Sequence, residues 1–178
     1  PGWLAFDAAT GTFSGTPTNG DVGSVNVTVT ATDSGNLSVA DTFGLTVTNV
    51  NDAPTVVSPI TDQAVTEDAA FSVVVPANTF ADVDLGDTLA LSANLANGDP
   101  LPTWLAFDAT TGTFSGTPGN GDVGSVNVTV TATDSGNLSA SDLFALTVAN
   151  VNDAPTVAQA LADQSMLEDA AFSFVVPA

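Results

Sequence analysis

The chain has 178 residues, of which 20 are Asp or Glu and none is Lys, Arg, His, Cys or Tyr. A net charge of −20 excludes nucleic acid and anionic lipid surfaces as partners, because binding to either depends on Lys and Arg, and it makes a cation the natural partner. Without His, Cys, Lys or Tyr, nucleophilic triads and transition-metal sites of the usual type cannot be built, so we expect no enzyme; a two-carboxylate glycosidase is the one formal alternative.

A tandem repeat organises the chain. Residues 102–178 repeat residues 1–77 at an offset of 101, with 77 − 17 = 60 identities. Such a period is a whole domain, because units of roughly 20 to 50 residues cannot bury a core alone. The polar segment NVNDAPTV, at 49–56 and again at 150–157, has the composition of a linker, and its proline fixes the local backbone.

Cutting at this linker predicts three pieces. Residues 1–53 are the C-terminal part of one repeat, residues 54–153 are a complete repeat, and residues 154–178 are the N-terminal strands of a following repeat. Neither flanking piece has enough chain to close a core, so both are predicted to need neighbours.

Period-two alternation predicts an all-β chain. Apolar residues alternate with polar ones over 25–31, and the same strand returns over 126–132. Between them lie an apolar group at 104–107, a turn at 108–112 and a strand that begins at Thr113. A strand over 144–148 is predicted to pair with 126–132 as a hairpin across a loop of residues 134–141.

The predicted architecture is an antiparallel Greek-key β-sandwich, because about seven short strands fall in each ~100 residues. Trp104 has two interpretations, a stacking platform for sugars or a core residue between two sheets. The core is favoured, since exposed aromatic binding faces usually use rings with a polar group and the chain has ten Phe and no Tyr.

Four acidic clusters stand at the ends of predicted strands. Their residues offer only oxygen ligands, which suits Ca²⁺ better than Mg²⁺ because Ca²⁺ tolerates irregular loops. Any one cluster is equally typical of a simple turn of Asp, Asn and Gly, but the four together favour calcium. The clusters are TED at 66–68, ADVDLGD at 81–87, ATDSGN at 132–137 and NVND at 150–153.

At these residues the chain resembles cadherin repeats, whose DxD, AxD and DxNDxxP calcium motifs are similar to ADVDLGD, ATDSGN and NVNDAP. The segment LPTWLAFDATTGTFSGTP, followed by SVNVTVTATDSGNLSASDLFALTV, resembles the dystroglycan-type cadherin-like repeat of large bacterial surface proteins and RTX-type adhesins. The resemblance covers the whole module. It implies immunoglobulin-like sandwiches strung end to end, with roles in calcium-dependent adhesion, self-association or polysaccharide binding.

The resemblance also implies two calcium junctions. The ligands of the first are the linker pair, the DxD pair, the AxD carboxylate and one additional acid, which are Asn51, Asp52, Asp82, Asp84, Asp134 and Asp87. The second junction would use the residue similar to the cadherin amino-terminal glutamate, its linker pair and a further acid, which are Glu67, Asn152, Asp153 and Asp68.

The chain departs from the cadherin pattern in two places. The LDRE motif is replaced by SGTPGNGD, and the first linker acid is replaced by Asn49 and Asn150. We therefore expect fewer ions per junction than in a cadherin, about one or two, with Asp122 compensating in part.

The leading hypothesis is a calcium-stiffened extender repeat of a giant secreted or cell-surface adhesin, whose partners are the neighbouring repeats. One alternative is a calcium-dependent module that binds carbohydrate or other copies of itself. Another is a subunit of an extracellular filament, in which incomplete modules of successive chains complete one another by strand addition. No apolar run approaches the ~20 residues that span a bilayer, so no membrane insertion is expected.

Overall fold

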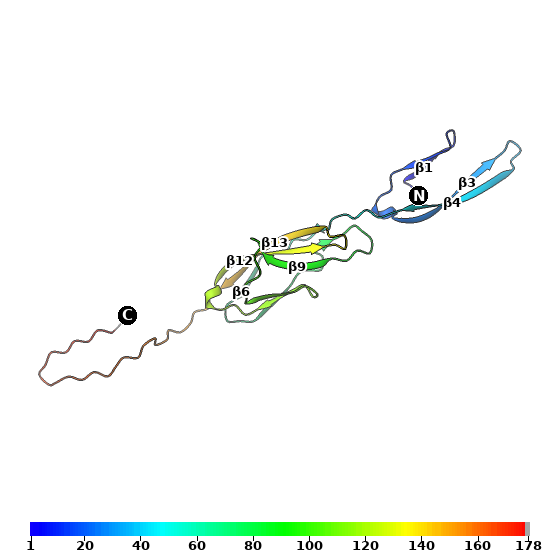
Figure 1. Cartoon of the computed structure of the whole chain (residues 1–178). Coiled ribbons are helices and arrows are strands. Elements are labelled where there is room, and N and C mark those ends of the chain that lie inside the picture. The colour runs from blue at the N-terminus through cyan, green and yellow to red at the C-terminus, as the bar shows by residue number, and fades with distance from the viewer. Residues whose placement is uncertain (177–178) are drawn as a thin grey trace.

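The computed structural model describes residues 1–176, whose regular structure consists of β-strands within residues 4–149 and two single-turn 3-10 helices. Three parts follow one another along it (Figure 1). We call residues 1–53 the leading segment, residues 54–149 the central sandwich and residues 154–176 the trailing segment. The leading and trailing segments lie at opposite ends of the central sandwich.

The leading segment consists of two antiparallel hairpins. Strand β1 (Leu4–Asp7) pairs with β2 (Thr12–Gly15), and β3 (Gly23–Thr32) pairs with β4 (Ser38–Val47). The 3-10 helix η1 (Asn19–Asp21) connects the two hairpins.

The central sandwich has two main sheets. One has the strand order β10 (Leu105–Asp108), β11 (Thr113–Gly116), β7 (Phe71–Val74). The other has the order β6 (Gln63–Thr66), β13 (Ser139–Ala149), β12 (Gly124–Thr133), β9 (Ala90–Leu95). A short pair is formed by β5 (Thr55–Val56) and β8 (Phe80–Ala81), and η2 (Asn120–Asp122) precedes β12. Every pair is antiparallel except β6 with β13, which is parallel.

The predicted all-β sandwich is confirmed, and its core follows the predicted alternation. Val128, Val130 and Ala132 of β12 are fully buried. From β13, Phe144 and Leu146 join the same core cluster. Trp104 is half-buried, packs against the cluster and meets the edge of Phe71 at a centroid distance of 6.2 Å, so it is a core residue.

The predicted hairpin exists, but its loop is shorter than predicted. Thr133 pairs with Ser139, so the loop comprises only residues 134–138. Residues 139–141 continue β13 because the hydroxyls of Ser139 and Ser141 find partners on β12, as in the 2.8 Å contact between Thr131 Oγ1 and Ser141 Oγ, while Ala140 packs against the core.

The same aromatic trio occurs in both copies of the repeat but is buried in only one. Phe114 lies 4.5 Å from Phe107 and 5.5 Å from Phe144 between ring centroids in the central sandwich. The matching rings of the leading segment, Phe6, Phe13 and Phe43, are 4.5 and 5.6 Å apart. Phe144 is 2% exposed and Phe43 is 41% exposed, because residues 1–53 contain no counterparts of β6, β7 and β9 to cover the trio.

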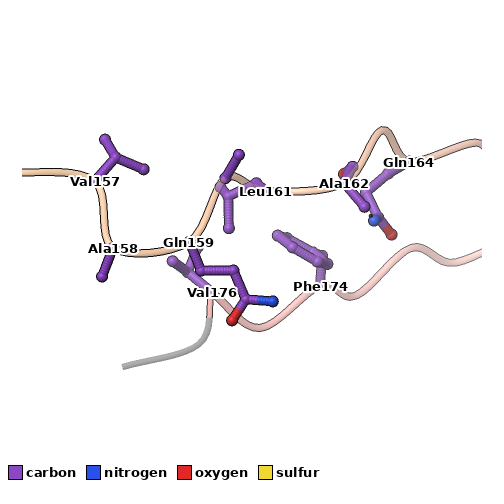
Figure 2. A pocket seen from close by; sticks show the side chains of 9 residues that line it. Val157, Ala158, Gln159, Leu161, Ala162, Gln164, Phe174 and Val176 are labelled. Atoms are coloured by element: carbon purple, nitrogen blue, oxygen red, sulfur yellow. Dashed lines mark hydrogen bonds between the residues drawn. The ribbon is translucent and has the colours of Figure 1, made fainter.

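The strands predicted for residues 154–178 are not seen in residues 154–176. In the central sandwich, the equivalent strands β6 and β7 pair with β13 and β11 of their own repeat. Among the described residues, no strand pairs with the trailing segment. Figure 2 shows Leu161, Phe174 and Val176 around a hollow between the two arms of this segment. Residues 177 and 178 lie outside the described part.

An acidic residue of β13 forms a hydrogen bond to the loop that leads into β6. Asp142 Oδ2 accepts a hydrogen bond of 2.6 Å from the backbone N–H of buried Ile60. Hydrogen bonds to charged groups contribute roughly 1.5–3 kcal/mol, so Asp142→Ala is expected to lower the free energy of unfolding by about that amount. Urea unfolding of the full chain measures the change.

The repeat supplies the control for this prediction. Asp41 is the equivalent residue of the leading segment, and its carboxylate accepts a bond from the adjacent Thr42 N–H. Asp41→Ala should change the free energy of unfolding by about 0.5 kcal/mol or less. Equal losses in the two variants would contradict the assigned role of Asp142.

Candidate metal centre

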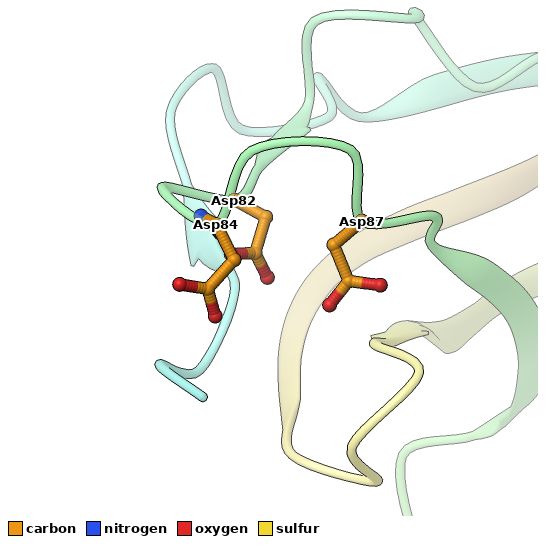
Figure 3. A group of neighbouring side chains, drawn as sticks. All are labelled: Asp82, Asp84 and Asp87. Carbon is orange, nitrogen blue, oxygen red and sulfur yellow. Dashed lines mark hydrogen bonds between the residues drawn. The ribbon is translucent and has the colours of Figure 1, made fainter. Parts of the chain in front are cut away.

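Three carboxylates gather in the loop between β8 and β9. Oxygens of Asp82, Asp84 and Asp87 all lie within 4.8 Å of one another (Figure 3). The loop curls because Asp84 N–H donates to Asp82 Oδ1 at 2.9 Å and Asp87 N–H donates to the Asp84 carbonyl at 3.2 Å. Gly86, with φ of +87°, provides the left-handed residue of this turn.

The linker that precedes β5 docks on this loop. Asp52 N–H donates to Asp84 Oδ2 at 2.8 Å, and Asn51 Nδ2 donates to Asp134 Oδ2 at 2.9 Å. Buried Asp134 begins the β12–β13 loop, where its Oδ1 accepts from Leu138 N–H at 2.8 Å. This loop also contacts the carboxylate group, through a 3.3 Å bond from Ser135 N–H to Asp87 Oδ1.

The structure thus gathers the six residues predicted for the first junction into one region, with two differences in detail. Asp134 is outside the group of three carboxylates and contacts the linker amide of Asn51. Asp52 reaches the loop through its backbone N–H, whereas its carboxylate accepts a 2.6 Å bond from Asn19 Nδ2 of η1.

The negative charge of these three carboxylates is not balanced by a positively charged side chain. Asp82 Oδ2 and Asp84 Oδ1 are buried and accept no hydrogen bond in the described structure, and Asp84 as a residue is only 7% exposed. The pKa of Asp87 is lowered, first by the hydroxyl of Ser135 and then by the backbone N–H of Thr88, so this carboxylate stays ionised. With no Lys, Arg or His in the chain, no side chain can neutralise the group. Buried charge without a partner is costly, and oxygen donors of this kind suit a hard divalent cation.

The second predicted junction centres on Glu67, which follows β6. This side chain is 1% exposed, and Oε1 accepts a 2.6 Å bond from Val151 N–H while Oε2 has no partner among the described residues. Asp68 is exposed, has φ of +58° and donates its N–H to the Pro118 carbonyl at 2.8 Å. The exposed linker residue Asn152 donates to the carbonyl of its neighbour Asp153 at 3.4 Å.

An asparagine contact that the predicted calcium motifs do not include recurs at both junctions. Asn120 Nδ2 of η2 donates to Asp153 Oδ2, as Asn19 does to Asp52 one repeat earlier. Asp122, expected to compensate for the missing LDRE acids, instead caps its own turn by accepting from Gly119 N–H at 2.9 Å. The available signal was the Asn-Gly-Asp retained in both copies of SGTPxNGD.

Gly136 provides the space for the docked linker. A Cβ built on this residue would overlap the side-chain amide of Asn51, although the backbone of Gly136 is not left-handed. Gly136→Ala is therefore expected to displace Asn51 from Asp134 and to lower the melting temperature by several degrees, a loss of about 1 kcal/mol.

Gly121→Ala is the matched control, because nothing lies within 4 Å of a Cβ at that position and its backbone is also not left-handed. Thermal unfolding followed by circular dichroism compares the two variants. If Gly136→Ala behaved like Gly121→Ala, the linker contact would not contribute to stability.

Residues 1–48 and 53–149 match the family model described as "Putative Ig domain". The chain belongs to this Ig-domain family. Each of the two matched stretches ends at the residue immediately before an NVNDAP linker.

Relatives of this Ig-domain chain include staphylococcal adhesins. It is 37% identical over 138 residues to the serine-rich adhesin for platelets of Staphylococcus aureus strain MRSA252, covering 77% of the chain and only 9% of that protein. The adhesin of strain USA300 is 36% identical over 138 residues, and 6% of its length is covered.

Solved structures of low sequence identity share the fold. Human mucin-like protocadherin EC1-2 aligns with a TM-score of 0.63 at 14% identity, covering 85% of this chain and 80% of that one. The extracellular cadherin domains 1–5 of protocadherin gamma B2 align with a TM-score of 0.61 at 21% identity, covering 84% of this chain and 32% of that one. These matches establish a cadherin-like sandwich. Within residues 1–176, no helix has the length and apolar character needed to cross a membrane.

Proposed function

We propose that the chain is part of a tandem array of an adhesin-type surface protein and that Ca²⁺ stiffens the joints between its repeats. The observation that carries the proposal is the pair of buried carboxylate oxygens without partners, Asp82 Oδ2 and Asp84 Oδ1, in a chain without cationic side chains. The likeness to a serine-rich adhesin supports the array, and the cadherin-like fold supports an end-to-end arrangement.

The ion would be held by Asp82, Asp84 and Asp87, with Asn51 and Asp134 at the linker side. Asn51 carries both a donor and an acceptor, so rotation of its amide would present an oxygen in place of the nitrogen that now faces Asp134. Bound calcium would supply the positive charge that these oxygens lack.

At the joint between the leading segment and the central sandwich, residues of both parts form hydrogen bonds with the linker. The Asp52 backbone is bonded to the central sandwich at Asp84, and the Asp52 carboxylate is bonded to the leading segment at Asn19. These contacts orient the linker beside the carboxylates before any ion binds. An ion that adds ligands from the same loop and linker would then remove the remaining freedom of the joint.

We extend the proposal to the second junction, where Glu67 would provide a ligand through the oxygen that has no partner, Oε2. Asp68, Asn152 and Asp153 would complete this site with residues of a following repeat. The repeat boundaries proposed are those of the linkers, with one complete module at 54–153. The match to the Ig-domain family over 53–149 supports this division.

The proposed location is extracellular or at the cell surface, and the proposed role is not enzymatic. Calcium sites of extracellular modules have dissociation constants of about 10⁻⁴–10⁻³ M, so they are filled outside cells and empty in cytosol. The finer assignment to dystroglycan-type cadherin-like repeats rests on the motif likeness alone. Binding of glycans is not favoured, because Trp104 packs on the core.

Because the chain contains no cysteine, spin labels on two introduced cysteines can test whether calcium stiffens the joint. Spin labels placed by Ala40→Cys on β4 and Ser92→Cys on β9, both at exposed positions, report the distance between the leading segment and the central sandwich. Calcium should narrow the distance distribution and raise the melting temperature relative to chelator, and Mg²⁺ should do so less effectively. An unchanged distribution together with an unchanged melting temperature would refute the proposal.

A further inference from the structure

Each of the two asparagines that contact a linker is followed directly by a glycine. Asn19 Nδ2 donates to Asp52 Oδ2 at 2.6 Å, and Asn120 Nδ2 donates to Asp153 Oδ2. In both copies the two residues are 33 positions apart, so the contact is a property of the repeat. An Asn-Gly pair is chemically reactive, because the glycine nitrogen can attack the asparagine side-chain amide without hindrance from a side chain of its own. The sequence has one further Asn-Gly pair, Asn97-Gly98, in the loop after β9.

The glycines of the two linker contacts are open to this reaction. A Cβ built on Gly121 would have no atom within 4 Å, and one built on Gly20 would meet only Thr18 Oγ1 at 3.8 Å. Neither glycine N–H has a hydrogen-bond acceptor within residues 1–176. Both backbone nitrogens are therefore free to act as nucleophiles.

The third pair is held differently. Gly98 N–H donates to the Leu95 carbonyl at 2.9 Å, so its nitrogen is already engaged. The Asn97 side chain is bonded through both of its polar atoms, since Nδ2 donates to Asp99 Oδ2 at 2.6 Å and Oδ1 accepts from Asp99 N–H at 3.1 Å. The geometry thus separates the two linker pairs from the pair at Asn97.

We propose that Asn19 and Asn120 are sites of spontaneous deamidation and that this modification releases the linker from the module that precedes it. At the second site, the Gly121 nitrogen forms a bond to Asn120 Cγ while the Cγ–Nδ2 bond breaks. The glycine proton passes to the leaving nitrogen, which departs as ammonia, and a five-membered succinimide ring remains. One water molecule then hydrolyses the ring at either carbonyl carbon and gives aspartate or isoaspartate. Asn19 and Gly20 react in the same way, and the reaction requires no oxidant.

Both products replace a hydrogen-bond donor by an anion. The new carboxylate would face the carboxylate of Asp52 or of Asp153. Like charges at hydrogen-bond distance repel, and the chain has no Lys, Arg or His to neutralise them. Isoaspartate also lengthens the main chain by a carbon, within a turn that is closed by the 2.8 Å bond from Asp122 N–H to the Gly119 carbonyl. The linker loses this contact whether or not a cation binds elsewhere at the joint.

The hydrogen bond that is lost also controls the rate of the reaction. The asparagine side chain must leave the aspartate and turn towards the next backbone nitrogen before the ring can close. The reaction is therefore confined to the fraction of molecules in which the contact is open. Removing the aspartate should raise this fraction about tenfold, as expected for the loss of a hydrogen bond to a charged acceptor. Conditions that loosen the joint thus promote a modification that prevents the contact from forming again.

A crossed experiment tests the protection, because each linker aspartate should protect only its own asparagine. In the full chain, in chelator at neutral pH, Asp52→Ala should accelerate deamidation of Asn19 about tenfold and leave the rate at Asn120 unchanged. Asp153→Ala should do the reverse. Mass spectrometry of peptic peptides measures each site, since trypsin has no Lys or Arg to cleave at. Asn97 is the internal reference and should react slowest in every folded protein.

The chain unfolded in urea gives the rates without the fold, and all three asparagines should react there at similar rates. The inference would be overturned if neither linker asparagine reacted in the folded variants over a period in which the unfolded chain was converted. Rates at Asn19 and Asn120 that did not depend on the paired aspartate would also overturn it.

The effect on the joint is tested with Asn19→Asp, which creates one of the two products, in chains spin-labelled through Ala40→Cys and Ser92→Cys. In chelator, Asn19→Asp should broaden the distribution of distances between the labels. Adding Asp52→Asn should restore it, because the amide and the carboxylate are then exchanged and can form the same hydrogen bond in reverse. A distribution unaffected by Asn19→Asp, or a double variant as broad as the single one, would contradict release of the linker. Because no calcium is present, this result is independent of the proposed calcium site.

Discussion

Replacing Phe114 by Ala is expected to lower the free energy of unfolding of the central sandwich by about 3–5 kcal/mol, the usual cost of removing a large buried aromatic side chain. Phe114 is 1% exposed and lies between Phe107 and Phe144, so its ring joins the two sheets. The cavity left by its removal is bounded by strands on both sides and cannot close without moving a sheet.

The repeat offers an unusually close control for this prediction. Phe13 has the same sequence neighbours and nearly the same ring contacts, but it belongs to the leading segment, which contains no fully buried residue among residues 1–50. Phe13→Ala should change the free energy of unfolding of the central sandwich, measured by urea unfolding, by about 0.5 kcal/mol or less. Similar losses from both substitutions would mean that the leading segment shares the cooperative core.

The strands of the central sandwich could be predicted because each has one buried face. Val128, Val130 and Ala132 alternate with threonines along β12, and this period of two indicates both the strand and its inner face. The end of the hairpin loop was misplaced because Ser139 and Ser141 are as typical of a loop as of an outer strand face. Only the register with β12 decides between the two.

The local sequence of a flanking segment does not determine whether that segment forms strands. Residues 164–167 differ from β6 mainly by apolar or small substitutions, yet they form no strand in this chain. A strand needs a partner for its backbone groups, and the partner of β6 is β13, about 80 residues later in the same repeat. Whether such a segment forms a strand is therefore decided by distant residues.

The candidate site was predictable in its carboxylates and unpredictable in its linker contacts. The DxD spacing of Asp82 and Asp84 places both acids in one turn, so their proximity follows from local sequence. The bond between Asn19 and Asp52 joins residues 33 positions apart across η1 and the linker. Turn residues such as Asn-Gly-Asp give no indication of which distant group they contact.

Replacing Asp84 by Asn is expected to have opposite effects with and without calcium. In chelator the variant should be at least as stable as the unmodified chain, because it removes one of three neighbouring negative charges and the Asn oxygen can still accept from Asp52 N–H. In calcium at about 100 times the dissociation constant, the unmodified chain should gain about 2.7 kcal/mol, a rise of about 10 °C or more in melting temperature, and the variant should lose most of that gain.

The change in sign of the stability effect between chelator and calcium distinguishes a loss of ion binding from an ordinary loss of contacts. A variant that only broke a structural hydrogen bond would be less stable by the same amount in both solutions. Asp99→Asn is the control, because it makes the same change of charge in an exposed loop, where Asp99 Oδ2 accepts from Asn97 Nδ2 at 2.6 Å. This variant should keep the full calcium-dependent gain in stability. Differential scanning calorimetry in chelator and in calcium measures all three proteins, and a parallel loss of stability for Asp84→Asn in both solutions would assign its carboxylate a purely structural role.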